Sequence, residues 1–230
     1  MKTSSKVKRV GMAEWRGMEE TIDAQLQTLA ERKCPVSWIS RLEQGAAPAL
    51  AFAAKRYRYG VEWPLLAVVP IGCLSLRRLL RLVVLRGLRT RTVLPEEQLF
   101  SFFETPQNPY WLISVDVGVG NLGIAPGLVA NQALKHRRRA LTVSESVALC
   151  VHEPRILKTL AIWAGGSYYE ENAFDSPTVY WQEGEGPWLG VGERDKGERD
   201  FGTPTADVEV MIECCPDGRA RIWKSKCVKQ

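Results

Sequence analysis

Apolar positions recur at helical spacing in the first part of the chain. Four apolar residues lie three or four positions apart: Met18, Ile22, Leu26 and Leu29. This spacing places them on one face of a helix, which we expect to end at Cys34 and Pro35. An alanine-rich stretch over residues 46–57 predicts a second helix that ends before Gly60.

Short strands and helices alternate in the middle of the chain. The apolar run at residues 65–69 precedes a proline and predicts a buried strand, and the aromatic and β-branched residues 110–116 predict another. Between them, the leucine- and arginine-rich residues 74–85 predict a helix. Pro126 is expected to open a helix that continues to about residue 138, because proline is favoured at the first helical position.

A Thr-x-x-Glu sequence marks the start of a further helix. Thr142 and Glu145 have the spacing of a capping box, in which two side chains satisfy backbone N–H groups at a helix start. The helix is expected to end at His152, before Pro154. A protonated imidazole at this end would interact favourably with the helix dipole, so we interpret His152 as a cap in preference to a catalytic group.

Strand patterns dominate after residue 160. Three strands are predicted at residues 160–164, 178–182 and 188–191. The clearest pattern is the alternation of apolar and polar residues over 208–213. A Pro-Asp-Gly turn ending at Gly218 then leads into residues 220–224, which predicts a terminal hairpin.

This order of elements predicts the α+β class. Helices come first, short strands with helices lie in the centre, and antiparallel strands with a hairpin come last, which is unlike regular βαβ winding. Residues 1–17 are polar and predict a flexible tail. Residues 18–230 are expected to form a single domain, whose 45% of hydrophobic residues suffices for a core.

Charge is distributed unevenly along the chain, whose net charge is +5. Residues 1–140 hold 21 lysines and arginines against 11 acids, and residues 141–230 hold 10 against 15. Most of this charge is expected to be solvated or neutralised within the molecule. The alternative is self-association, in which the basic part of one copy contacts the charged loop at residues 192–200 of another.

The sequence predicts a cytoplasmic protein without a membrane span. No apolar run follows the basic N-terminus as a secretory signal requires. The best membrane candidate, residues 64–85, is interrupted by Arg77, Arg78 and Arg81. Six cysteines without an export signal are expected to stay reduced, and the predicted hairpin separates Cys214 from Cys227, so no metal site is expected.

A glycine-rich turn is the best candidate for a nucleotide site. Gly118, Gly120 and Gly123 fit G-x-G-x-x-G after a predicted strand that ends in Asp116, and such glycines can let a pyrophosphate approach the backbone at a helix start. The helix at Pro126 begins too late for this role, however, and no repeated βαβ pattern surrounds the turn. The competing interpretation is a structural turn with no cofactor.

Two basic stretches are candidates for binding phosphates. They contain Arg77, Arg78, Arg81, Lys135, Arg137, Arg138 and Arg139. Together they form a nucleic-acid-binding hypothesis, which requires both stretches to share one exposed face. The alternative is that the cations at residues 135–139 simply favour the C-terminal end of a helix. No sequence motif of a known nucleic-acid reader accompanies them.

A set of scattered positions between residues 108 and 190 forms a pattern: Asn108-Pro109-Tyr110, Val115-Asp116-Val117-Gly118, Pro126, Leu141-Thr142, Ser144-Glu145, Ala148-Leu149, His152, Pro177, Trp181 and Leu189-Gly190. In these positions the chain resembles an uncharacterised bacterial family known only as a domain of unknown function. It implies a bacterial protein but transfers no catalytic residue or cofactor, because no activity is established for the family.

The sequence therefore leaves the function unknown. Our leading hypothesis is a non-enzymatic binding or interaction protein, because no set of catalytic residues converges and no cofactor is implied. The alternatives are a nucleotide-using enzyme with its site at residues 118–123, and a nucleic-acid-binding protein that uses the basic stretches.

Overall fold

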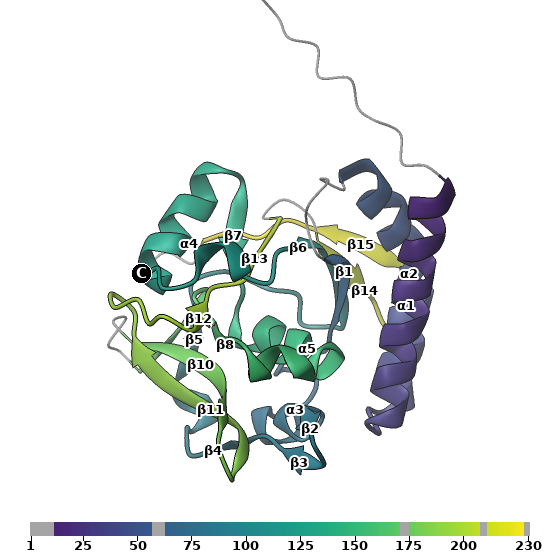
Figure 1. Ribbon diagram of the computed structural model, residues 1–230. Coiled ribbons are helices and arrows are strands. Elements are labelled where there is room, and N and C mark those ends of the chain that lie inside the picture. The colour runs from purple at the N-terminus through teal and green to yellow at the C-terminus, as the bar shows by residue number, and fades with distance from the viewer. Residues whose placement is uncertain (1–11, 57–62, 171–174, 208–210, 228–230) are drawn as a thin grey trace, which may run out of the picture.

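The computed structural model describes residues 12–56, 63–170, 175–207 and 211–227 (Figure 1). Within them, five α-helices and fifteen mostly short strands form a four-stranded sheet, a five-stranded sheet and three two-stranded pairs. This confirms the α+β class. A single core cluster of buried side chains extends from the N-terminal helices to both larger sheets.

The four-stranded sheet is antiparallel throughout. Its order is β1 (Trp63–Val68), β6 (Tyr110–Val115), β14 (Met211–Cys214) and β15 (Ala220–Trp223). Every residue of β6 is buried. Both faces of this strand are therefore buried, which explains why its sequence is apolar without alternation.

Two long helices pack on one face of this sheet, at the right of Figure 1: α1 (Met12–Glu31) and α2 (Val36–Arg56). The indole Nε1 of Trp111 in β6 donates a hydrogen bond of 2.8 Å to the carbonyl of Leu42 in α2. Gly45 allows this close approach, since a Cβ there would lie 2.3 Å from Sγ of Cys214 in β14. The described residues 12–17 are helical, so the predicted tail through residue 17 is wrong for these positions.

Helix α1 also closes the outer edge of β1. The side-chain amide of Gln25 donates to the carbonyl of Leu65 (2.9 Å) and its oxygen accepts from the N–H of Ala67 (2.7 Å). The Gln25 side chain therefore pairs with the edge of β1 as a further strand would. Without it, backbone N–H and C=O groups of this edge strand would stay unpaired.

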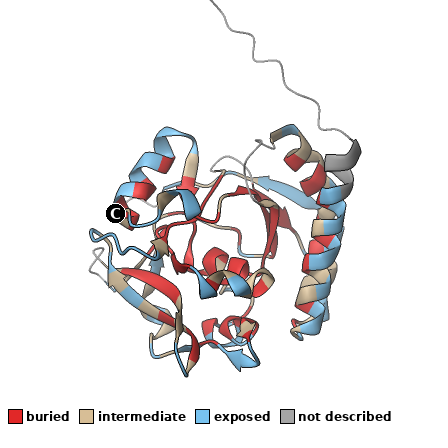
Figure 2. Cartoon of the chain, in the orientation of Figure 1, coloured by how far each residue is buried: buried red, intermediate tan, exposed pale blue. Residues whose placement is uncertain are grey.

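Helix α5 (Val143–His152) occupies the centre of the molecule. Eight of its ten residues are buried, and Figure 2 shows buried residues concentrated around it and the neighbouring strands. The predicted capping box marks its start: Glu145 Oε2 accepts a hydrogen bond of 2.8 Å from the N–H of Thr142.

The five-stranded sheet lies on the other side of α5 from the long helices. Its order is β12 (Phe201–Gly202), β8 (Ala161–Trp163), β10 (Asp175–Gln182), β11 (Gly186–Glu193) and β4 (Arg91–Thr92). The pairs β11–β4 and β12–β8 are parallel, and the others are antiparallel. The sheet contains the three strands predicted between residues 160 and 191.

The remaining elements connect these layers. They are α3 (Leu76–Leu80), α4 (Pro126–Lys135), β2 (Val84–Leu85), β3 (Leu88–Arg89), β5 (Leu99–Ser101), β7 (Arg138–Ala140), β9 (Ser167–Tyr169), β13 (Thr205–Asp207) and the 3₁₀ helices η1 (Glu96–Gln98), η2 (Val119–Asn121) and η3 (Pro154–Lys158). Strand β7 pairs with β13 and β5 with β9, so both pairs join segments that are distant in sequence.

The helix predicted over residues 74–85 is shorter than expected. Helix α3 ends at Leu80, and the chain then forms the hairpin β2–β3 through Arg86 and Gly87, whose φ values are 53° and 79°. Two consecutive residues with positive φ are typical of a type I′ hairpin turn. Gly87 therefore completes a turn between two strands and does not end a helix.

One further prediction is wrong in its end point, and another is confirmed. Helix α4 ends at Lys135, and Arg138 already belongs to strand β7, although the helix was expected to reach it. The terminal hairpin forms as predicted over β14 and β15, with Cys214 paired to Ala220. The predicted alternation at residues 208–210 lies outside the described residues.

Candidate functional site

The glycine-rich turn packs against the chain itself. Gly118 has a φ of 89°, and a Cβ there would lie 2.8 Å from the backbone of Thr203. The side chain of Asn121 forms two hydrogen bonds with the backbone of Thr203, each 2.8 Å long. Gly120 has open space around it, because no atom lies within 4 Å of the position that a Cβ would occupy there.

The backbone amides of this turn donate hydrogen bonds within the protein. The N–H of Gly118 donates to the Asp116 carboxylate (2.8 Å), and the N–H of Gly123 donates to the carbonyl of Phe201 (3.1 Å). A phosphate cradle requires such amides to point at the ligand. Asp116 and the glycines therefore form a structural turn, and nothing in its geometry favours the nucleotide hypothesis.

The basic run after α4 divides into an exposed and an inward-facing part. Lys135 and Arg137 are exposed. Arg138 donates to the backbone of Ser114 (2.9 Å) and of Thr205 (2.8 Å). Arg139 is fully buried, so it cannot contact the phosphates of a nucleic acid as the sequence hypothesis required.

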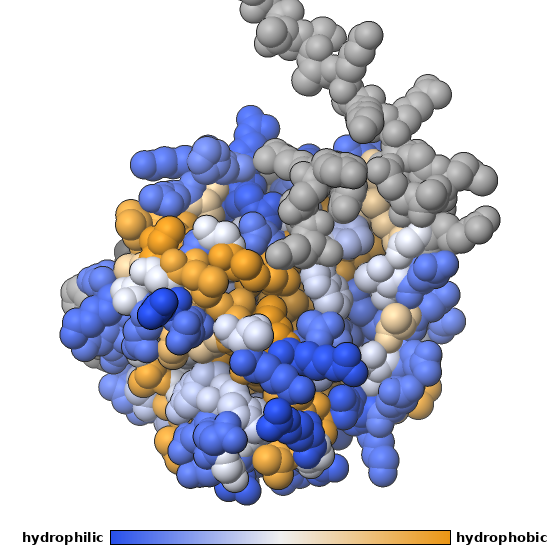
Figure 3. Space-filling view, in the orientation of Figure 1, coloured by the Kyte–Doolittle hydropathy of each residue, from blue (hydrophilic) through white to orange (hydrophobic). Residues whose placement is uncertain are grey.

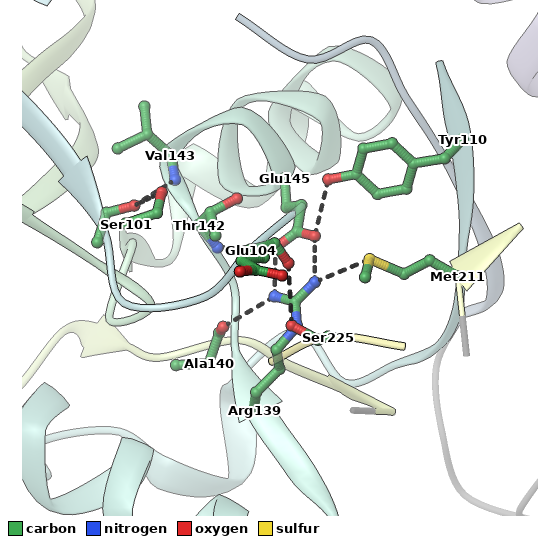
Figure 4. A network of polar contacts seen from close by, with 11 residues as sticks. Ser101, Glu104, Tyr110, Arg139, Ala140, Thr142, Val143, Glu145, Met211 and Ser225 are labelled. Carbon is green, nitrogen blue, oxygen red and sulfur yellow. Dashed lines mark hydrogen bonds and ion pairs between the residues drawn. The ribbon is translucent and has the colours of Figure 1, made fainter. Parts of the chain in front are cut away.

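Arg139 instead belongs to a buried polar network between β7, β6 and α5 (Figure 4). Its guanidinium forms a bidentate pair with the Glu145 carboxylate, in which Nη1 donates to Oε2 at 2.6 Å and Nη2 donates to Oε1. The hydroxyl of Tyr110 donates to Oε1 of Glu145 at 2.9 Å, and Nη1 of Arg139 also donates to the carbonyl of Ala140 at 3.2 Å.

The pKa directions in this network follow from burial and from pairing. Burial alone would raise the pKa of Glu145, but the Arg139 charge and the hydrogen bonds from Arg139, Thr142 and Tyr110 outweigh it and lower the pKa. Burial and the neighbouring carboxylate raise the pKa of Tyr110 well above its usual value. Since all three ionisable side chains are fully buried, we interpret this network as a structural link between the sheet and α5.

The other basic stretch remains at the surface. Helix α3 buries Leu76, Leu79 and Leu80 and exposes Arg77 and Arg78. The exposed Arg81 follows directly as its C-cap. Helices α3 and α4 lie at opposite ends of the molecule in Figure 1. The two basic stretches therefore do not share one face, so the nucleic-acid hypothesis cannot hold in its original form.

A second set of cations joins the α3 arginines from the turn after α1. They line a pocket of about 180 Å³, which we call the α1–α3 pocket. Its lining consists of Arg32, Lys33, Pro35, Leu74, Arg78, Arg81, Leu82 and Arg89. Five of these eight residues are basic and none is acidic, which makes the pocket a candidate site for an anion.

The backbone at Lys33 is unusual. Its φ is 62°, and the N–H groups of Lys33 and Cys34 donate to the carbonyls of Ala30 (2.9 Å) and Leu29 (2.9 Å). These bonds form the Schellman motif that ends α1, in which the left-handed position usually holds glycine. A lysine here costs about 1 kcal/mol relative to glycine. This conformation places a positive charge on the lining of the α1–α3 pocket.

A second pocket lies beside the first and shares Arg81 with it. This α3–β4 pocket has a volume of about 330 Å³ and is lined by Arg77, Leu80, Arg81, Thr90, Arg91, Thr92 and Trp188. Trp188 lies in β11 opposite Arg91 of the edge strand β4. Again no acidic side chain lines the pocket.

Five arginines of the two pockets have no carboxylate partner in the described part of the structure. Among the ion pairs of the described residues, none involves Arg77, Arg78, Arg81, Arg89 or Arg91. A carboxylate does approach α3, since Glu96 accepts a hydrogen bond of 2.6 Å from the N–H of Leu76. Glu96 thus caps the helix and lines neither pocket.

His152 has a different role from the one predicted. Its Nε2 donates to the carbonyl of Ala67 in β1 at 3.1 Å, and burial lowers its pKa to about 4. The imidazole is therefore neutral at pH 7, and the prediction of a protonated cap at the end of α5 is wrong. It also lines a pocket of about 310 Å³ between α1, β1 and α5, which has no basic cluster.

Cys34, Cys73 and Cys214 lack the properties of activated nucleophiles. Burial raises the pKa of Cys34 and of Cys73 to about 11, and that of Cys214 to about 12, so these thiols stay protonated at neutral pH. In the part of the chain that is described, no three His, Cys, Asp or Glu residues lie close enough together to hold a metal ion. Cys227 pairs with Phe103 in an isolated bridge, away from Cys214.

The charged loop that follows β11 packs near the glycine-rich turn. The carbonyl of Arg194 accepts a hydrogen bond of 3.1 Å from Gly127, and the Arg194 guanidinium lies over the ring of Phe102. Figure 3 shows an apolar area on the face where α4 lies in Figure 1. Leu128 in α4 is one of the exposed large apolar side chains. Self-association through this region stays a prediction.

No helix among the described ranges is both long and apolar enough to span a bilayer. Comparison of the chain with family models, with curated proteins and with solved structures gives no match. The resemblance to a family of unknown function therefore stays a prediction, as does the cytoplasmic location.

Proposed function

We propose that this protein is a binding protein for a ligand that carries several phosphate groups, and that it recognises this ligand at the α1–α3 and α3–β4 pockets. The observation that supports the proposal is the convergence of seven cations on two adjoining pockets that lack acidic residues. They are Arg32, Lys33, Arg77, Arg78, Arg81, Arg89 and Arg91.

The chemistry of these pockets suits phosphate in particular. The guanidinium group presents planar donors that bind phosphate oxygens in pairs, and six of the seven cations are arginines. A single phosphate monoester carries fewer than two full charges at neutral pH. Cations distributed over two pockets therefore match an extended anion better than an isolated phosphate.

The proposal develops our leading hypothesis of a non-enzymatic binding protein. Neither pocket contains a histidine, a cysteine or a carboxylate that could act as a nucleophile or a general base. The residues present can bind and orient an anion, and binding is what the geometry supports best.

Calorimetric titration with inorganic tripolyphosphate at low salt tests the proposal. The double substitution Arg78→Ala with Arg81→Ala should weaken binding by about tenfold or more, since each charge-assisted hydrogen bond contributes 1 kcal/mol or more. The matched control is Lys135→Ala with Arg137→Ala, which removes the same charge at the exposed end of α4. Its effect should stay below about twofold.

Two results would overturn the proposal. One is the absence of binding by the unaltered protein at low salt, where electrostatic attraction is strongest. The other is an equal loss of affinity in the two double variants, which would show that net charge and not the pockets attracts the anion.

A further inference from the structure

The α3–β4 pocket contains an aromatic side chain that a ligand made only of phosphate would not use. Trp188 lines this pocket together with Arg91 and Arg77, and it is only partly buried. The α1–α3 pocket, in contrast, has cations and aliphatic side chains but no aromatic residue. The two pockets therefore differ in chemistry, although they share Arg81.

We infer that the ligand is a single-stranded nucleic acid, whose backbone phosphates bind in the α1–α3 pocket and one of whose bases enters the α3–β4 pocket beside Trp188. This inference rests on the proposed function, because it names the class of the phosphate-bearing ligand. Proteins that bind single strands combine a basic groove for the backbone with aromatic side chains that stack on bases.

The arrangement of the cations supports a chain-like ligand. Arg78 and Arg81 line the first pocket and Arg77 and Arg81 line the second, so one short helix supplies cations to both. A backbone that crosses α3 would meet positive charge continuously. The volume of about 330 Å³ in the second pocket is ample for one base together with part of its sugar.

The pockets favour a single strand over a duplex. Both are recesses flanked by the turn after α1, by α3 and by the short strands β3 and β4. In a duplex the bases are stacked and paired, so none can enter a recess unless it is flipped out at a cost of a few kcal/mol. A single strand can turn one base towards Trp188 without this cost.

The binding of a fluorescein-labelled oligothymidylate of about ten nucleotides, measured by anisotropy, tests the inference. Trp188→Ala should weaken this binding by about fivefold or more, because stacking on one base is lost. Trp188→Phe retains an aromatic ring and should weaken it less. Thermal unfolding of both variants checks that β11 remains folded, since Trp188 pairs with Tyr180 and Arg91 there.

An abasic oligomer with the same number of phosphates separates the two proposals. It should bind more weakly than the oligothymidylate, and Trp188→Ala should leave its affinity unchanged. The Arg78→Ala with Arg81→Ala variant should lose affinity for both oligomers. With about five phosphates contacted, affinity should fall about 100-fold between 50 and 200 mM salt.

Each contrary outcome has a distinct meaning. Equal affinity for the abasic and the thymidylate oligomers would overturn the inference but leave the proposed phosphate binding intact. Tighter binding of a duplex than of a single strand would also overturn it. Binding of vesicles that contain anionic lipid, without binding of either oligomer, would show that the ligand is a membrane surface. Failure to bind any of these anions would refute both proposals.

Discussion

The buried pair of Arg139 and Glu145 makes a prediction about stability that depends on pH. Both side chains are fully buried and joined by two hydrogen bonds. Removal of one partner of such a pair costs about 3–5 kcal/mol, because a charge remains in the interior. The two possible removals differ, since a glutamate can be neutralised by protonation at moderate pH whereas an arginine cannot be neutralised.

Glu145→Gln leaves the Arg139 charge without a counter-ion. We expect this variant to lose about 3–5 kcal/mol at pH 7 and nearly the same at pH 5. Arg139→Met leaves Glu145 with its donors from Tyr110 and Thr142 but without a positive charge. Because the unfolded pKa of a glutamate is about 4.3, protonation of this carboxyl at pH 7 costs about 4 kcal/mol. This cost is the upper limit on the stability that the unpaired carboxylate charge can remove.

The sign of the pH effect follows from this difference. In Arg139→Met the folded pKa of Glu145 lies above its unfolded value, so stability decreases as pH rises from about 4.3 towards the folded pKa. The deficit relative to the unaltered protein should shrink by up to about 1.4 kcal/mol for each unit that pH is lowered from 7 to 5. The deficit of Glu145→Gln should stay constant over this range.

Urea denaturation followed by circular dichroism at pH 5, 6 and 7 measures these deficits. The double variant Arg139→Met with Glu145→Gln contains neither charge and should be more stable than Glu145→Gln alone. Losses below about 1 kcal/mol in both single variants would contradict the structure, because they would place the pair in water. A pH-independent deficit in Arg139→Met would show that Glu145 stays ionised without Arg139.

Three other predictions follow from single residues. Burial of neutral His152 should leave the free energy of unfolding unchanged above pH 6.5 and lower it by about 3 kcal/mol as pH falls to the folded pKa of about 4. Urea denaturation should show this decrease in the unaltered protein and not in His152→Gln. Gly118→Ala should cost about 2 kcal/mol or more in the same assay, because its φ is 89° and the Thr203 backbone is close. Gly120→Ala should cost less than about 0.5 kcal/mol, and the reverse order would contradict the packing of Gly118 against Thr203. Lys33→Gly should raise the stability by about 1 kcal/mol but weaken tripolyphosphate binding, and a variant that loses stability would contradict the left-handed conformation.

Local patterns in the sequence predicted those elements that local forces determine. The apolar run at β6, the capping box at α5 and the turn of the β14–β15 hairpin all form where the residues indicated. In each case, neighbouring residues suffice to define the element. The α3 region shows the limit of this reasoning, because Leu82 to Leu85 continue an apolar helical pattern although the next two residues form a hairpin turn.

The role of Arg139 could not be predicted from its neighbours. It lies in a run of five basic residues that looks like a solvated surface, yet it alternates with Arg138 along β7 and is directed into the core. Its partner Glu145 was explained entirely by the capping box. Only the packing of β7 against α5 brings the two side chains together, and this contact leaves no periodic signal in the sequence.

The candidate site was only partly visible for a similar reason. Arg77, Arg78 and Arg81 could be identified as a basic stretch, but Arg32 and Lys33 lie more than forty residues earlier, at the end of an ordinary helix. They join the α3 arginines because α1 packs across α5 and β1, which brings its C-terminal turn beside α3. Trp188 was one of many late aromatic residues, and only the parallel pairing of β11 with β4 sets it opposite Arg91.

The distribution of ion pairs bears on why these cations are present. Internal neutralisation of the basic part by the acidic part was the simplest expectation, and Arg56 with Asp207 and Arg139 with Glu145 provide examples of it. The five arginines from α3, β3 and β4 form no such pair within the described residues. Like charges on two adjoining pockets repel one another and destabilise the fold. A polyanion that binds there relieves this repulsion in the folded state alone, so it should raise the unfolding temperature in proportion to the logarithm of its concentration.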